Sequence, residues 1–182
     1  MIKTTREMVL AAIFAAVMSI FSVIAVPIGP VSVTMGVFGV LFTALTLSPM
    51  TAVFSVLIFI LCGAVGLPVF SGLKGGIGVL IGPTGGYIWS YIFMAVICAA
   101  SVKLTESMNK KKAIIIKFCA CIAAVALCYF LGTLQFSSVM EKTMRESLLI
   151  CVYPFIPFDI AKSVIAVALS EQVRKRLPKS GE

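Results

Sequence analysis

The sequence predicts an all-α integral membrane protein: a single membrane domain over residues 1–182, built as a bundle of six transmembrane helices. Two observations predict this class. Hydrophobic residues make up 60% of the chain and charged residues only 12%, whereas a soluble domain carries about a quarter charged residues. The apolar residues also fall in long unbroken runs, which favours helices over a membrane β-barrel, whose strands read as short alternating segments.

The first three spans lie in the N-terminal third of the chain. A basic start precedes the first apolar run, as in a signal peptide. The run is nevertheless long enough to cross a membrane and lacks a convincing cleavage site, so we expect a transmembrane helix at about residues 6–26. Pro27 and Pro30 end it, because proline cannot continue a helix. The second and third spans are expected at 33–48 and 50–63.

The segment over residues 63–86 differs from the spans around it. Glycine and proline are dense there, and one lysine, Lys74, lies within it. We expect a structured loop that folds back against the bundle, since loops of this length in a compact domain are usually functional. The fourth span follows at 85–104.

Two further spans complete the predicted bundle. The fifth is expected at 114–136, between two polar connections. The sixth is expected at 147–173, but Pro154 and Pro157 interrupt its helical pattern. We therefore place the main part of the sixth helix from Pro157 onward.

Basic residues predict the orientation of the bundle. Six spans put both termini on one side of the membrane. Eleven lysines and arginines fall on that side, against three on the other side, where Lys74, Lys142 and Arg145 lie. The eleven are Lys3, Arg6, Lys103, Lys110, Lys111, Lys112, Lys117, Arg174, Lys175, Arg176 and Lys179. Because basic residues accumulate on the cytoplasmic side, both termini are expected there.

Composition also excludes several kinds of chemistry. The chain has no histidine, so it can form neither a Ser-His-Asp triad nor a histidine-ligated zinc site. Its six cysteines lie in apolar stretches without a CxxC motif, which is typical of small buried side chains rather than of a metal site. The net charge of +8 is better explained by residues flanking spans than by nucleic-acid binding. No metal, cofactor or catalytic residue is expected.

Asp159 and Lys162 are the main anomaly, because a charge within a membrane segment costs about 2.5–3.5 kcal/mol on the insertion scale. They are three residues apart on the predicted sixth helix, so they share one face. Pro157 suits a first helical turn, which places Asp159 where a carboxylate is favoured. The pair is either a salt bridge that pins the bundle or, as we prefer, a polar patch in a pocket that opens outward.

The sequence GPTGGY, over residues 82–87, marks the entry to the fourth span. Backbone amides at a helix start can face an anion, and glycines allow a ligand to approach the backbone closely. A tight turn with Thr84 as the N-cap explains the same residues equally well. The chemistry alone does not separate these two readings.

Four alanines in the first span, Ala11, Ala12, Ala15 and Ala16, form two overlapping small-xxx-small pairs. Such stripes let helices pack closely. The stripe serves either packing inside this bundle or the docking of another membrane subunit.

The motif GLPVFSG…GGIGVLIGPTGGY, together with PFIPFDIAK, resembles the BioY family over nearly the whole chain. BioY proteins are the biotin-binding S components of energy-coupling factor (ECF) transporters. The resemblance implies a high-affinity biotin-binding and translocating subunit in a prokaryotic cell membrane. It further implies two kinds of partner, a transmembrane coupling protein and a pair of ATPase subunits. The ATPase subunits would hydrolyse ATP, and this chain would not. The alanine stripe is similar to the segment through which S components dock on the coupling subunit.

The resemblance also implies how biotin would be held. Asp159, which accepts hydrogen bonds, and Lys162, which donates them, would complement the ureido ring. Phe70, Tyr87 and Trp89 are candidates for the apolar slot. The biotin carboxylate would meet Thr84 and the amides of Gly85 and Gly86. Some family members carry an arginine in the fourth span; residues 87–100 contain none, so Lys74 is the nearby substitute.

Three other functions compete with this interpretation. An S component for another vitamin, such as riboflavin or thiamine, would keep the fold and partners. A membrane-embedded enzyme needs several clustered acids or histidines, and we place only one acid, Asp159, within a span. A purely structural membrane subunit would not need the costly Asp159–Lys162 pair.

Overall fold

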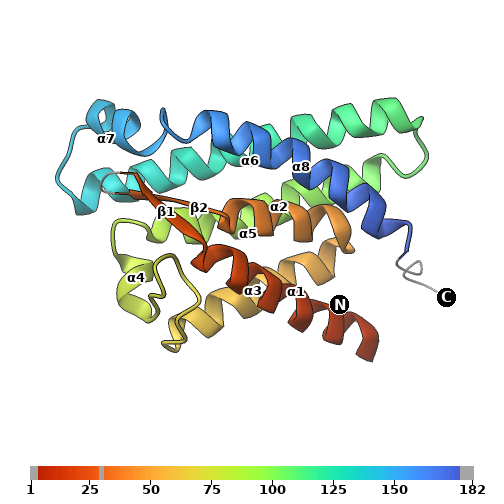
Figure 1. Ribbon diagram of the computed structural model, residues 1–182, viewed down its shortest axis with the longest axis horizontal. Helices are drawn as coiled ribbons and strands as arrows, with labels where there is room; N and C mark the ends of the chain where they lie inside the picture. The colour runs from red at the N-terminus through yellow and green to blue at the C-terminus, as the bar shows by residue number, and fades with distance from the viewer. Residues whose placement is uncertain (1–3, 29–30, 177–182) are drawn as a thin grey trace.

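The computed structural model describes residues 4–28 and 31–176, and these residues form a helical bundle with one small β-hairpin (Figure 1). In chain order the elements are α1 (Thr5–Val23), β1 (Ala25–Ile28), β2 (Val31–Thr34), α2 (Gly36–Thr46), α3 (Pro49–Ala64), α4 (Ile77–Ile81), α5 (Gly85–Leu104), α6 (Lys110–Val139), α7 (Met144–Cys151) and α8 (Ile156–Arg174).

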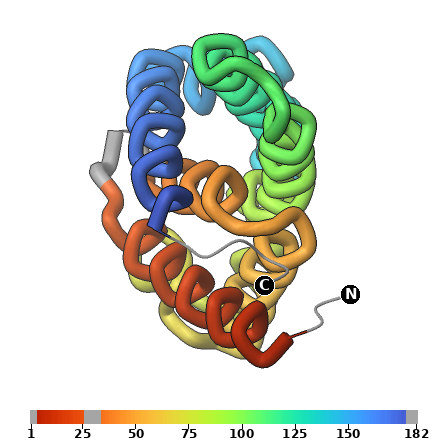
Figure 2. The backbone as a smooth tube through the Cα atoms, turned by 90° about the vertical axis from the view of Figure 1, so that its right-hand side faces the viewer, coloured from red at the N-terminus to blue at the C-terminus, as the bar shows by residue number. Residues whose placement is uncertain are grey.

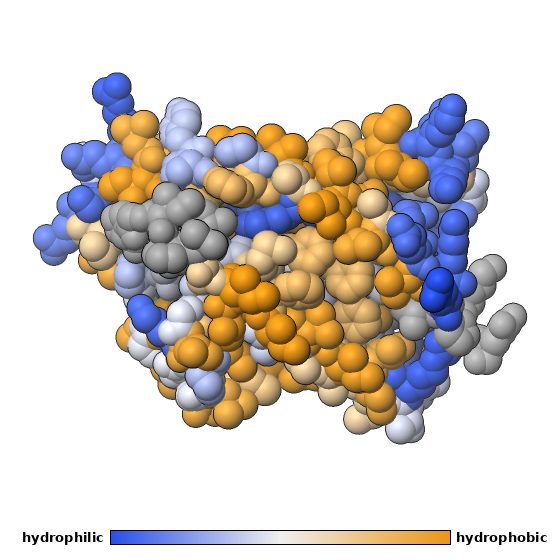
Figure 3. Space-filling model, in the orientation of Figure 1, coloured by the Kyte–Doolittle hydropathy of each residue, from blue (hydrophilic) through white to orange (hydrophobic). Residues whose placement is uncertain are grey.

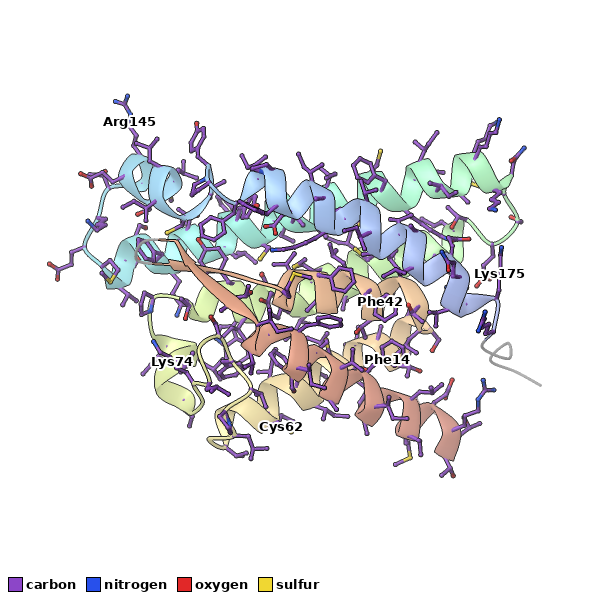
Figure 4. All side chains as sticks on the ribbon, in the orientation of Figure 1. Phe14, Phe42, Cys62, Lys74, Arg145 and Lys175 are labelled. Atoms are coloured by element: carbon purple, nitrogen blue, oxygen red, sulfur yellow. The ribbon has the colours of Figure 1, made fainter. Side chains whose placement is uncertain are left out.

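The longer helices run along the long axis of the molecule, so the bundle has two ends (Figure 1). We call the end that carries the hairpin, α4 and α7 the hairpin end. The opposite end, where α1 begins and α8 ends, is the terminal end. Figure 4 places the side chains of Lys74 and Arg145 at the hairpin end and that of Lys175 at the terminal end. Lys3 and Lys179 lie outside the described residues.

Helix α2 forms the centre of the bundle. Nine of its eleven residues are buried, and it packs against α1, α5 and α8. The view along the helices shows it enclosed by its neighbours (Figure 2). Aromatic rings fill part of this contact: Phe14 on α1 and Phe42 on α2 have centroids 5.8 Å apart and planes tilted by 30° (Figure 4).

The outside of the bundle is apolar where a membrane would meet it. On the face that Figure 3 shows, hydrophobic side chains cover most of the middle, and hydrophilic side chains gather at both ends. Three helices, α1, α5 and α6, are long and apolar enough to cross a membrane. The α7–α8 pair, bent by 54°, gives a fourth candidate, while α2 and α3 are shorter apolar helices.

The hairpin was not expected from the sequence. Strands β1 and β2 combine the last two residues expected in the first span and the first two expected in the second with residues 27, 28, 31 and 32 of the connection. The strands pair antiparallel, with Val26 opposite Val33. Two causes explain the difference. Proline cannot continue α1 past this point, and the flanking valines, isoleucine and threonine are β-branched, which favours an extended backbone.

The remaining boundaries differ from the predicted spans mainly in length. Helix α5 covers the range predicted for the fourth span, whereas α6 extends beyond 114–136 at both ends. The predicted sixth span is two helices: α7 starts at a capping box formed by Thr143 and Glu146, and α8 starts with Pro157 in its first turn. The break between them bends the chain, so α7 and α8 do not form one straight helix.

Candidate functional site

A cavity of about 340 Å³ lies in the hairpin half of the bundle. This volume falls at the lower end of the range of about 300–1,000 Å³ found for small-molecule sites. Its walls come from α1, β2, α2, the loop between α3 and α4, α4, α5, α6, α7 and α8. Five aromatic residues contribute to them: Phe70, Tyr87, Tyr91, Tyr129 and Phe155.

Asp159 and Lys162 form the charged part of this cavity. Lys162 Nζ lies 2.7 Å from Asp159 Oδ1, and the two side chains are only 8% and 4% exposed, respectively. Asp159 sits in the first turn of α8, where the helix dipole favours a carboxylate. The predicted pair is therefore formed, buried and placed in the wall of a cavity. The structure thus allows both of the readings left open by the sequence, since the pair is a salt bridge and also lines a pocket.

Two further groups hold this pair in place. Tyr129 on α6 donates its hydroxyl to Asp159 Oδ2 at 2.6 Å. Lys162 also donates to the backbone carbonyl of Thr34 in β2, at 2.7 Å. Buried charges are tolerated when additional hydrogen bonds satisfy them, so the ion pair depends on three elements: α6, α8 and the hairpin. Sequence reasoning named neither Tyr129 nor Thr34.

The loop between α3 and α4 contributes the residues predicted there. Phe70 is 1% exposed, and its ring packs edge-on against Phe59 with centroids 5.5 Å apart. Gly63 makes room for it, since a Cβ at that position would collide with the Phe70 ring. The Phe70 amide donates to the Lys74 carbonyl at 2.9 Å. As expected, the loop folds back on the bundle, and both Phe70 and Lys74 line the cavity.

The GPTGGY segment is only partly in the site. Thr84 and Tyr87 line the cavity, whereas Gly85 and Gly86 do not. The Gly85 amide donates to the Gly82 carbonyl at 3.1 Å, so it closes a turn. A Cβ on Gly86 would lie 2.5 Å from the Leu131 carbonyl oxygen of α6. The two glycines therefore serve close packing of α5 on its neighbours, and neither of them lines the cavity.

A glutamine on α6 fixes the same turn. Gln135 Nε2 donates to the carbonyls of Leu80 and Gly82, at 2.9 and 2.7 Å. These carbonyls lie at the end of the short helix α4, where no further helical turn can satisfy them. Gln135 thereby holds Thr84 at the cavity wall.

Trp89 lies outside the cavity. Its side chain is 45% exposed, and its indole nitrogen donates to the Leu80 carbonyl at 3.3 Å. Successive residues of an α-helix are about 100° apart, so Trp89, two residues after Tyr87, faces nearly the opposite direction. Tyr87 thus lines the cavity and Trp89 does not, although the sequence suggested one slot for both.

The alanine stripe of α1 divides into two faces. Ala11 and Ala15 are buried in the bundle, where α1 packs on α2 and α3, whereas Ala12 and Ala16 are exposed. Half of the predicted docking stripe is thus internal packing. Ala12 and Ala16 remain available to another helix.

A second buried ion pair was missed in the sequence. Lys117 on α6 donates to Glu171 on α8, and the Lys117 side chain is only 8% exposed. We had counted Lys117 among the residues flanking a span and Asp159 as the acid within one. Glu171 lies within α8 as well, and within the range expected for the sixth span, so it is a second acid there. Among the described residues, no group of three or more cysteines and acids is arranged to hold a metal ion.

Comparison with known proteins gives one consistent family. The sequence model of the BioY family matches residues 1–179. The biotin transporter BioY of Thermotoga maritima is 32% identical over 170 residues, which is 93% of this chain and 96% of the relative. A probable biotin transporter BioY of Pyrococcus horikoshii is 31% identical over 169 residues, again 93% and 96% of the two chains.

A solved structure agrees in fold over the same extent. The crystal structure of the S-component for biotin from an ECF-type ABC transporter superposes with a TM-score of 0.83. It is 26% identical in sequence, and the match covers 95% of each chain.

Proposed function

This chain belongs to the BioY family, and on that premise we propose that it is the biotin-binding S component of an ECF-type vitamin uptake transporter. Relatives named for biotin and the matching biotin S-component structure support this function. They favour biotin over riboflavin or thiamine, the alternative ligands considered from the sequence.

The Asp159–Lys162 pair is the observation that carries the proposal. An ionised carboxylate only accepts hydrogen bonds and an ammonium group only donates them. The ureido ring of biotin places an N–H donor beside a carbonyl acceptor, which is the complementary arrangement. Because the pair is buried in a cavity wall, a ligand that fails to satisfy both charges would lose much of its binding energy.

The rest of the cavity suits the apolar and anionic parts of the same ligand. Phe70, Tyr87 and Tyr91 offer aromatic surface for the sulfur-containing ring and the valeryl chain. Lys74 and Thr84 also line the cavity, and we assign the biotin carboxylate to them. Gly85 and Gly86 have no part in this assignment, because both pack against neighbouring backbone.

We further propose six membrane crossings, made by α1, α2, α3, α5, α6 and the α7–α8 pair, with both termini cytoplasmic. Helix α2 has 11 residues and at about 1.5 Å per residue is too short for a hydrocarbon core of about 30 Å. The hairpin extends the same crossing. Non-helical backbone is tolerated at this depth where it lies against protein or a cavity, and Lys162 donates to the hairpin carbonyl of Thr34.

The basic residues support this orientation. Lys110, Lys111 and Lys112 lie at the start of α6, and Arg174 and Lys175 at the end of α8, all at the terminal end. Lys74 and Arg145 lie at the hairpin end (Figure 4). With the richer end cytoplasmic, the cavity faces the outside of a prokaryotic cell membrane.

We assign the energy-consuming step to partner subunits. An S component of this type works with a transmembrane coupling protein and two ATPase subunits, and no ATP hydrolysis is assigned to this chain. The exposed Ala12 and Ala16 on α1, beside the exposed Ile13 and Ile20, form the surface that we propose for docking the coupling protein. Small residues at such a face let two helices approach closely.

Identification of the bound ligand tests the proposal directly. The protein is purified in mild detergent from cells, denatured, and the released small molecules are identified by mass. The emptied protein is then titrated with biotin, riboflavin and thiamine. We expect biotin to co-purify and to be the tight ligand of the three; a protein that binds riboflavin or thiamine but no biotin would overturn the proposal.

A further inference from the structure

Tyr129 contributes a polar contact to the cavity for which the biotin proposal gives no role. It lies on α6, half-buried, with its side chain in the cavity wall. Its hydroxyl donates to Asp159 Oδ2 at 2.6 Å. Charge-assisted bonds of this length are among the stronger hydrogen bonds in proteins, so this contact bears directly on how Asp159 is held.

The two oxygens of Asp159 are held from different helices. Lys162, on the same helix, donates to Oδ1 at 2.7 Å, and Tyr129, on α6, donates to Oδ2. The last torsion of an aspartate side chain is soft and broadly populated. With Lys162 alone the carboxylate plane is free to turn, whereas the second bond fixes that plane across the gap between α6 and α8.

Lys162 is held in a similar way. Of the three N–H donors of its ammonium group, one is used by Asp159 and one by the Thr34 carbonyl. One donor remains. Asp159 keeps about two of its roughly four lone-pair positions after the bonds from Tyr129 and Lys162 are made. Among the described residues, Asp159 and Lys162 therefore keep an acceptor and a donor that a ligand in the cavity can use.

We propose that Tyr129 is a positioning residue for ligand recognition, which acts by fixing the Asp159 carboxylate toward an N–H group of the ligand. This inference rests on the proposed function, in which that N–H belongs to the ureido ring of biotin. A group held in its binding geometry before the ligand arrives loses less freedom on binding. Tyr129 thus raises the affinity of the protein for a ligand that presents an N–H group next to a carbonyl group.

Two substitutions and three ligands test the role of Tyr129. Tyr129→Phe keeps the ring and removes the hydroxyl. Tyr153→Phe is the matched control, because Tyr153 is 62% exposed and does not line the cavity. The ligands are biotin and its two derivatives methylated at one or the other ureido nitrogen. Titration of each purified variant gives the dissociation constants, and thermal unfolding checks the fold.

We expect Tyr129→Phe to weaken biotin binding by about tenfold or more, as for loss of a hydrogen bond to a charged group. One methylated derivative lacks the N–H that Asp159 binds. For this derivative, wild type and Tyr129→Phe should differ in affinity by less than about threefold, because loss of the hydroxyl matters only when the ligand N–H is present. Tyr153→Phe should leave all three affinities unchanged. Tyr129→Met, which also removes the hydroxyl, gives the same test if the phenylalanine variant does not accumulate.

The possible outcomes separate this inference from the proposed function. Equal losses for all three ligands would reduce Tyr129 to a packing residue and overturn the inference. Unchanged biotin affinity in Tyr129→Phe would do the same while leaving the proposed function standing. A wild-type protein that binds no biotin would overturn both.

Discussion

Lys117 on α6 donates to Glu171 on α8. The two helices that meet at the Tyr129–Asp159 hydrogen bond are therefore also joined by an ion pair, which lies closer to the terminal end. The Lys117 side chain is 8% exposed and that of Glu171 is 25% exposed. A buried charge is costly once its partner is removed. The Lys117–Glu171 pair therefore helps to hold α6 and α8 together on the terminal side of the cavity.

Breaking the Lys117–Glu171 pair should destabilise the bundle. Lys117→Met leaves Glu171 with an uncompensated charge, and we expect the free energy of unfolding to fall by about 1–3 kcal/mol. The loss is smaller than for a fully buried pair, because Glu171 keeps some solvent contact. The double variant, with Glu171→Met added, should recover most of this loss. Thermal unfolding in detergent measures both changes.

The nearby Arg174–Glu106 pair supplies the control. Arg174 Nη2 lies 3.6 Å from Glu106 Oε1, and the side chains of Arg174 and Glu106 are 28% and 63% exposed, respectively. Exposed pairs of this kind contribute about 0–1 kcal/mol, so Glu106→Gln should hardly change the unfolding temperature. A double Lys117→Met, Glu171→Met variant as unstable as the single one would show that lost packing, rather than an unpaired charge, is the cause.

Asp159→Asn should weaken biotin binding by about an order of magnitude or more and leave the bundle folded. Asparagine keeps the shape of the side chain and one acceptor oxygen, but it loses the charge and the second acceptor. Titration of the purified variant with biotin measures the change. Unchanged affinity would remove Asp159 from the binding site.

Lys162→Met distinguishes binding from stability at the same pair. It leaves Asp159 with Tyr129 as its remaining side-chain donor and takes the side-chain donor from the Thr34 carbonyl. We expect both stability and affinity to fall. Adding Asp159→Asn should restore stability, because the uncompensated charge is gone, but should not restore affinity for biotin. Recovery of both would mean that the pair acts only as a structural clamp.

The Asp159–Lys162 pair could be predicted because its signal is energetic and local. Two opposite charges one helical turn apart in an apolar run have few explanations. Glycines carry a weaker signal, since the same residue suits close approach by a ligand or by another helix. At Gly86 the close neighbour is the Leu131 carbonyl, and the sequence offered no means to choose. Helical phase alone places Trp89 on a different side of α5 from Tyr87, and this could have been worked out from the sequence.

The partners of the pair depend on tertiary structure. Lys162 and Thr34 are 128 residues apart in the chain, and Asp159 and Tyr129 are 30 apart. No local pattern connects such positions. The hairpin was missed for a different reason: its outer residues, 25, 26, 33 and 34, read as parts of apolar spans. Only the β-branching of its valines, isoleucine and threonine favoured strands.

Gly132→Ala should disturb the cavity through Tyr87. A Cβ on Gly132 would collide with the Tyr87 ring, which lines the cavity. Overpacking of this kind costs about 1–3 kcal/mol, and the ring would have to move toward the ligand space. We therefore expect both a lower unfolding temperature and weaker biotin binding, measured on the same purified sample.

Gly78→Ala is the matched control for Gly132→Ala. A Cβ there meets nothing within 4 Å, and Gly78 lies in the helix α4, where alanine is the better helix former. Its stability and affinity should be unchanged or slightly raised. Equal effects of the two alanine variants would mean that the Gly132–Tyr87 contact has no special importance.

Lys74→Ala should weaken binding of biotin but not of biotin methyl ester, if the lysine is the charged partner of the ligand carboxylate. Lys74 lines the cavity but is exposed, and exposed pairs contribute at most about 1 kcal/mol, or roughly fivefold in affinity. The loss should shrink as salt is added, because solvent-accessible charges are screened. Lys142→Ala, a change at the same end but outside the cavity, should affect neither ligand. An equal loss for acid and ester would show that Lys74 acts on the shape of the loop, through its backbone contact with Phe70, rather than on the carboxylate.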